Sequence, residues 1–160
     1  MSHVNLGKAS PATYQSLSAF DATAQANAAA AGLDPLLVEL VRIRASQING
    51  CAYCLRLHSR DAISKGESAD RLAVVAAWWE SQYFSAKEQA ALILAERLTN
   101  ISLGPIGVHN TVDVEAVLTA QEIAAVSWLV ILINAWNRVA ISSHCTVAPS
   151  GAGERDLVQV

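Results

Sequence analysis

Apolar residues recur along most of the chain at helical spacing. Between residues 11 and 143 they fall three and four positions apart, and no segment alternates apolar and polar residues between hairpin turns. The pattern therefore predicts an all-α protein built as a bundle of about six helices. These are expected over residues 11–31, 34–49, 51–65, 68–79, 85–100 and 123–143, with a short helical turn at 114–118.

Start and stop signals support these boundaries. Asp34 precedes a proline at the first turn of the second helix, and capping boxes stand at Ser85–Glu88 and Thr119–Glu122. Asn49-Gly50 is a turn signal at the end of the second helix. Cys51 is therefore expected to open the third helix, where free N–H groups and the helix dipole favour a thiolate.

The composition indicates one soluble domain that associates with copies of itself. A chain of 160 residues can bury a full core, and the Gly-Pro break at 103–107 leaves too little on either side for two domains, so residues 1–160 are expected to form one. Hydrophobic residues make up 52% and charged residues only 16%, which favours an oligomer. The net charge of −3, with scattered Lys and Arg, excludes the basic surface that nucleic acids or acidic membranes require.

Hydropathy and cysteine usage indicate the cytoplasm. The N-terminal residues contain no apolar leader, and the longest apolar stretch, 123–136, is interrupted by Ser127 and Asn134 and is expected to be too short to span a bilayer. Two of the three cysteines have Cys-x-x-Cys spacing, which in a reducing compartment is typical of catalysis or metal binding rather than of a secreted disulfide framework.

The most informative cluster comprises Cys51, Cys54 and His58. On a helix that advances about 100° per residue they fall at about 0°, −60° and −20°, so all three project from one face. His58 lies one turn beyond Cys54 and can take its proton, while Cys51 can attack an oxidised sulfur on Cys54. This arrangement predicts a redox site or a metal site.

Glu39 lies within an otherwise apolar helix. A buried carboxylate without a partner would cost several kcal/mol, so a cysteine-histidine pair is one candidate partner. The alternative is an ion pair with Arg42, three residues further along the same helix, on an exposed face.

The spacing Glu-x11-Cys-x2-Cys-x3-His, residues 39–58, resembles the active-site signature of the AhpD-like alkylhydroperoxidases of the carboxymuconolactone decarboxylase family. The surrounding residues 44–54, the helix start at 84–88 and the segment 133–138 are similar to the peroxidase-related branch of that family. The resemblance spans roughly residues 33–144. Immediately before the second cysteine, this chain has Tyr53 where the best-known members have histidine.

The resemblance implies a helical subunit in a homotrimer or homohexamer with peroxiredoxin-type peroxidase activity on hydrogen peroxide or alkyl hydroperoxides. Cys54 would be the peroxidatic thiol, Cys51 the proton donor and resolving thiol, and Glu39 with His58 the proton relay. The reductant would be a dithiol, with a lipoyl-bearing protein as the family-level suggestion. No metal or bound organic cofactor is expected.

Other interpretations stay open at this point. A zinc site could use Cys51, Cys54 and His58 with His144 or Cys145 as fourth ligand, although ligands on one helix are cramped for tetrahedral geometry. The decarboxylase branch shares the resembling fold but lacks the cysteine pair, and a purely structural cysteine pair leaves Glu39 unexplained. Cys145 by itself is interpreted as a small buried hydrophobe. The four tryptophans are interpreted as packing or pocket walls.

Overall fold

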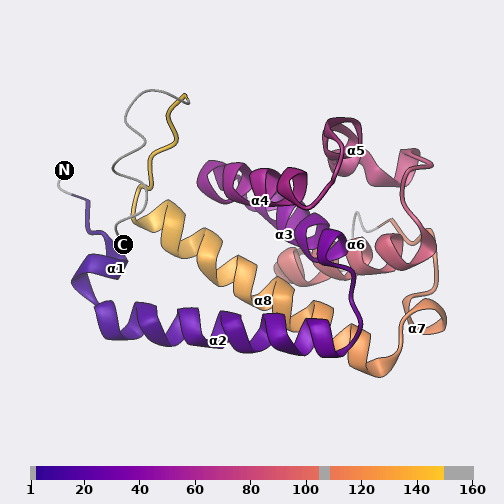
Figure 1. Cartoon of the computed structure of the whole chain (residues 1–160), viewed down its shortest axis with the longest axis horizontal. Helices are drawn as coiled ribbons and strands as arrows, with labels where there is room; N and C mark the ends of the chain where they lie inside the picture. Colours follow the sequence, from indigo (N-terminus) through magenta and orange to yellow (C-terminus); the bar gives the residue numbers. More distant parts are fainter. Residues whose placement is uncertain (1–2, 105–108, 150–160) are drawn as a thin grey trace.

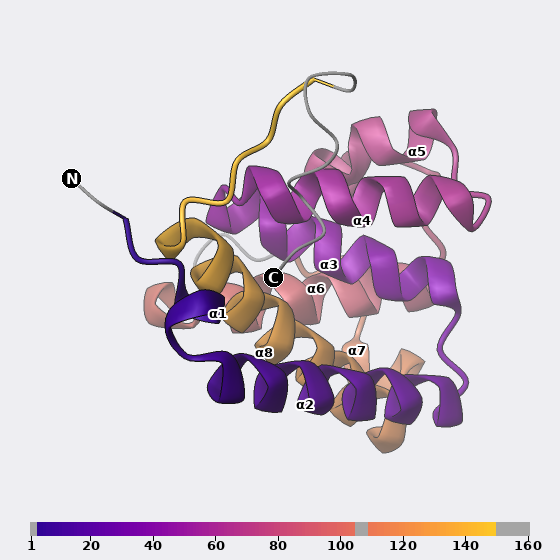
Figure 2. The same cartoon turned by 60° about the vertical axis from the view of Figure 1, so that its left-hand side comes forward.

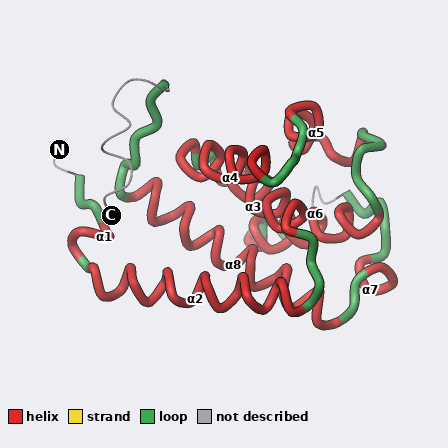
Figure 3. The backbone as a smooth tube through the Cα atoms, viewed as in Figure 1, coloured by secondary structure: helices red, strands yellow, loops and turns green. Residues whose placement is uncertain are grey.

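The computed structural model describes residues 3–104 and 109–149. Over these ranges the chain forms eight α-helices and two 3-10 helices joined by loops, with no strand (Figure 1, Figure 3). The expected all-α class is confirmed. The helices are α1 (Leu6–Ala9), α2 (Pro11–Ala30), α3 (Pro35–Asn49), α4 (Ala52–Ser64), α5 (Ala69–Val74), η1 (Val75–Glu80), α6 (Ala86–Thr99), η2 (Ile101–Leu103), α7 (Val114–Val117) and α8 (Ala120–Ser142).

Helices α3 and α8 form the centre of the bundle. Helix α8 packs against α2, α3 and α6, and α3 also packs against α4 and α6. Figure 2 shows α4, α3 and α2 in order across the molecule, with α8 crossing between α3 and α2. Fully buried Leu40, Leu92 and Leu129 come from three of these helices. Each such side chain contributes about 1.5–3 kcal/mol by leaving water, so the core holds these helices in fixed relative positions.

The local signals in the sequence have the expected structural roles. Both capping boxes are present, with Ser85 and Thr119 each exchanging hydrogen bonds with the glutamate three residues later. The Asp34 side chain accepts from the backbone N–H of Leu36 at the start of α3. Gly50 ends that helix in the left-handed region, at φ +67°, which favours glycine. The turn between α3 and α4 is therefore specified locally.

The fourth expected helix is broken. Its regular part, α5, ends at Val74, and the backbone continues as η1 with Ala77 outside the helical region. The break allows the fully buried Trp78 to donate from its indole Nε1 to Glu96 Oε1 on α6, at 2.8 Å. This tertiary contact explains the difference. Helix α1, which was not expected, has only four residues, too few for a periodic pattern.

Helix α8 also differs from expectation. It has 23 residues and extends beyond both ends of the apolar stretch 123–136, and the whole helix is long and apolar enough to cross a membrane by length and composition alone. In the bundle, however, its Leu129, Val130 and Ile133 are buried against neighbouring helices. Its apolar character therefore serves the core of this fold. Of the break expected at 103–107, residues 105–107 lie outside the described ranges.

Candidate active site

The two cysteines of the Cys-x-x-Cys pair lie at the N-terminus of α4 and are joined by a disulfide. Cys51 is the N-cap residue, as expected, and its Sγ accepts from the backbone N–H of Cys54 at 3.3 Å. Both residues are buried. Because the pair occupies the positive end of the helix dipole, the local field favours a thiolate once the disulfide is reduced.

His58 lies one turn further along α4, and α3 supplies its partner. The Nδ1 atom of His58 is 2.9 Å from Glu39 Oε2. The Glu39 side chain has no exposed surface, and the packing of α3 against α4 brings the two residues together across 19 positions of sequence. The disulfide and His58 therefore lie one helical turn apart at the start of α4, and Glu39 of α3 contacts the histidine.

Three side chains contact the Glu39 carboxylate. His58 contacts Oε2, while Arg42 Nη1 at 3.3 Å and Lys65 Nζ at 2.5 Å donate to Oε1. The Arg42 pairing that was considered from the sequence is present, but it is buried rather than on an exposed face. Burial alone would raise the pKa of Glu39, yet the hydrogen bonds and positive charges outweigh it and lower this pKa to about 2.

The charge of Glu39 assigns the proton on His58. An ionised carboxylate only accepts hydrogen bonds, so Nδ1 of His58 is the nitrogen that carries hydrogen. When the ring is neutral with its hydrogen on Nδ1, the lone pair is on Nε2, which can then act as a base.

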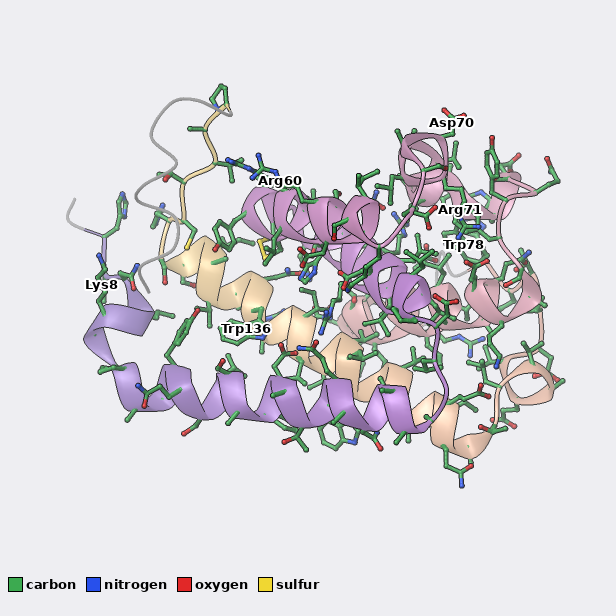
Figure 4. All side chains as sticks on the ribbon, viewed as in Figure 1. Lys8, Arg60, Asp70, Arg71, Trp78 and Trp136 are labelled. Carbon is green, nitrogen blue, oxygen red and sulfur yellow. A yellow bond between two sulfur atoms is a disulfide. The ribbon has the colours of Figure 1, made fainter. Side chains whose placement is uncertain are left out.

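A cavity of about 250 Å³ adjoins Cys54 and His58. Its walls include three aromatic side chains: Tyr14 of α2, Tyr53 of α4 and Trp136 of α8. Tyr14 and Trp136 meet edge to face at a centroid distance of 5.1 Å. Figure 4 shows Trp136 between α8 and α2, with the disulfide drawn as a yellow bond beside α4. The cavity can admit a mainly apolar molecule to one end of the disulfide.

Comparison with known proteins identifies the family. Residues 14–97 match the model of the carboxymuconolactone decarboxylase family. The chain belongs to this family. The uncharacterized protein YdfG of Bacillus subtilis is 35% identical over 104 residues, which cover 65% of this chain and 71% of YdfG. The uncharacterized protein YnjA of Escherichia coli is 38% identical over 64 residues, covering 40% of this chain and 35% of YnjA.

A solved structure extends the likeness. A crystal structure from Agrobacterium tumefaciens, of a protein of unknown function described as a proposed antioxidant defence protein AhpD, is 27% identical with a TM-score of 0.80. It covers 92% of this chain, which in turn covers 99% of that protein. This chain is therefore an AhpD-like member of the carboxymuconolactone decarboxylase family, as the residues 39–58 indicated, and an enzyme of the peroxidase or decarboxylase kind.

Glu39, His58 and Asp61 are of the residue types that bind metal ions. In the part of the chain that the structure describes, ligand atoms of Glu39, His58 and Asp61 lie within 4.8 Å of one another. Two cations already donate to one oxygen of Glu39, however, and their charges oppose a metal ion there. The zinc set considered from the sequence needs thiolates, which Cys51 and Cys54 offer only when their disulfide is reduced.

Three further residues lie around the site. Cys145, considered from the sequence as a zinc ligand or a small buried hydrophobe, is a half-buried free cysteine that lines the same cavity as Cys54, and burial raises the pKa of its thiol. Lys65 lies seven residues after His58, two helical turns along α4, and this spacing could have indicated that both face Glu39. Tyr14 reaches the cavity from a distant helix, so no local signal could have placed it.

Proposed function

We propose that the protein is a cytoplasmic thiol peroxidase that reduces hydrogen peroxide or alkyl hydroperoxides through Cys51 and Cys54. One observation carries the proposal. Cys54 and His58 line the cavity together, whereas Cys51 does not line it and is bonded to Cys54. A substrate in the cavity can therefore reach one sulfur and one base, with the second sulfur directly behind the first.

The first step is attack by Cys54. In the reduced protein, Nε2 of His58 takes the proton of the Cys54 thiol, and Glu39 stabilises the imidazolium through Nδ1. The Cys54 thiolate then attacks the outer oxygen of the peroxide, and the O–O bond breaks. The departing oxygen takes the proton from His58 and leaves as water or an alcohol. Cys54 has become a sulfenic acid, and the peroxide has been reduced by two electrons.

The second step closes the disulfide. The Cys51 sulfur attacks the sulfenic sulfur of Cys54, the S–O bond breaks, and the hydroxyl leaves as water with the proton of the Cys51 thiol. The product is the disulfide that is present in this structure. A dithiol of the lipoyl class would complete the cycle by exchange, becoming a disulfide itself as it returns two thiols.

The proposal includes assembly into a homotrimer or homohexamer. Its support is an apolar surface on α2 and α8, where Phe20 packs edge to face on Trp128 and Ile131 lies one turn further along α8. Trp128 and Ile131 are each 45% exposed, which is costly for side chains of this size in water. Burial against a second copy would remove that cost.

The decisive experiment compares single cysteine variants. The reduced protein is mixed with peroxide, and its cysteine peptides are identified by mass with a dimedone-type reagent present. We expect Cys51→Ser to accumulate a trapped sulfenic acid on Cys54, and Cys54→Ser to lose peroxide consumption. Cys145→Ser is the matched control and should still form the Cys51–Cys54 disulfide.

Two outcomes would contradict the proposal. If Cys54→Ser forms a sulfenic acid on Cys51 at the wild-type rate, the two roles are inverted. If neither Cys51→Ser nor Cys54→Ser changes peroxide consumption, the peroxidase function is wrong, and the decarboxylase interpretation takes its place.

A further inference from the structure

The Glu39–His58 pair joins two separate cavities. His58 lines the 250 Å³ cavity beside Cys54, and Glu39 lines a second cavity of about 130 Å³ between α2, α3 and the end of α4. The two cavities have no lining residue in common. The hydrogen bond between the two side chains therefore connects the cavity beside Cys54 with the cavity that Lys65 lines.

Lys65 reaches Glu39 from this second cavity. It follows the last residue of α4, and Gly66, at φ +101°, turns the chain directly after it. The side chain is 40% exposed, yet its Nζ donates to the buried Oε1 of Glu39 at 2.5 Å. Lys65 thus contacts one carboxylate oxygen of Glu39 while His58 contacts the other. The two contacts together fix the orientation of the carboxylate.

The charges around Glu39 come from three elements. Arg42 on α3 donates to the same oxygen as Lys65 but at the longer distance of 3.3 Å, and it shares its charge with Asp21 of α2 at 3.5 Å. Asp61 on α4 places a second carboxylate within 4.8 Å of Glu39 and His58. Two carboxylates this close compete for a proton unless cations accompany both. Lys65 is the cation with the shortest contact to Glu39.

We propose that Lys65 is a positioning residue of the thiol site: from the second cavity it holds Glu39 as a carboxylate directed at His58, and so keeps His58 ready to take the proton of Cys54. The inference rests on the proposed thiol chemistry but not on peroxide as the oxidant. Lys65 itself contacts neither sulfur nor substrate. Its effect passes through Glu39 to His58.

The sign of the effect follows from the contacts. Lys65 is the cation with the shortest contact to Glu39, and without it the Oε1 atom keeps only the longer contact with Arg42. The carboxylate is then held less firmly toward Nδ1 of His58, which makes His58 a less effective base for Cys54. The rate at which the Cys54 thiol reacts should therefore fall throughout the pH range in which Glu39 is ionised.

The test measures thiol reactivity directly. In the reduced protein, the rate of Cys54 alkylation by iodoacetamide is followed by peptide mass from about pH 4 to pH 9, beside the rate of oxidation by hydrogen peroxide. For Lys65→Met we expect both profiles to shift downward, with rates about tenfold lower throughout this pH range, because Glu39 is ionised in all of it but no longer held in place. Lys65→Arg retains the charge and should restore the wild-type profile.

Lys87 provides a matched control. Its Nζ donates to the buried carboxylate of Glu122 at 2.5 Å and its side chain is 45% exposed, closely matching Lys65, but neither residue lines the cavity beside Cys54. Lys87→Met should leave both profiles unchanged. A loss of stability would be common to Lys65→Met and Lys87→Met. An effect on the thiol site is expected for Lys65→Met alone, so the comparison separates the two causes.

The outcomes separate this inference from the proposed function. A wild-type profile for Lys65→Met, an equal shift for Lys87→Met, or failure of Lys65→Arg to restore the profile would each overturn the role of Lys65. If the alkylation profile shifts as expected while the wild-type protein does not react with peroxide, the role of Lys65 stands and the peroxidase proposal fails.

Discussion

Replacing Glu39 by glutamine should make the stability of the protein less dependent on pH. The substitution keeps the size of the side chain and removes the charge that Arg42, His58 and Lys65 contact. Because the Glu39 side chain has no exposed surface, water cannot replace those contacts. The variant therefore isolates the energetic contribution of one buried carboxylate.

The magnitude follows from the pKa of Glu39, which is lowered from 4.5 to about 2. At about 1.4 kcal/mol per pKa unit, its ionisation stabilises the fold by about 3 kcal/mol at pH 7. Since the pKa is lower in the folded protein, this stabilisation is fully present above the ordinary pKa and is lost as the pH falls toward 2. The stability difference between wild type and Glu39→Gln should thus shrink by about 2 kcal/mol between pH 7 and pH 3.

Urea unfolding of the disulfide form, followed by tryptophan fluorescence at several pH values, measures this difference. Glu115→Gln removes an exposed carboxylate on α7 and controls for the loss of one negative charge. Its effect should stay within about 0.5 kcal/mol at every pH. A destabilisation by Glu39→Gln that is equal at pH 7 and pH 3 would refute the reasoning, because it would mean that the lost contacts do not depend on ionisation.

The remaining predictions concern packing, metal and assembly. Asn137→Ala should lower the free energy of unfolding by about 2–4 kcal/mol, because this buried amide accepts a hydrogen bond from Asn49 and donates one to Ser46. Urea unfolding measures this free energy, and Asn110→Ala, which removes an exposed amide, is the control. Elemental analysis should find no stoichiometric zinc in the purified protein, and a chelator should leave its melting temperature unchanged; one zinc per chain would favour the zinc interpretation. Light scattering should give the mass of a trimer or larger assembly, and a monomer at micromolar concentration would contradict the proposed association.

Features that depend on neighbouring residues could be read directly from the sequence. Cys51, Cys54 and His58 lie within eight residues around one helix, so helical geometry alone places them on one side. The left-handed turn at Gly50 and the capping hydrogen bonds of Ser85 and Thr119 also arise within a few residues. Local sterics and hydrogen bonding specify such features before any helix packs on another.

Other features required the packed bundle. Whether the ion pairs of Glu39 are exposed or buried depends on how α3 lies against α4. That position is set by the packing of core side chains from several helices. The bend at Ala77 likewise exists because Trp78 reaches Glu96 on another helix, which overrides the helical preference of its own segment. The cavity wall combines Tyr14 with Trp136 across 122 positions of sequence. Local patterns therefore specify the reactive cysteines and histidine and the helix that carries them. The charge around Glu39 and the shape of the cavity beside Cys54 arise only in the packed bundle, because both depend on contacts between helices that are distant along the chain.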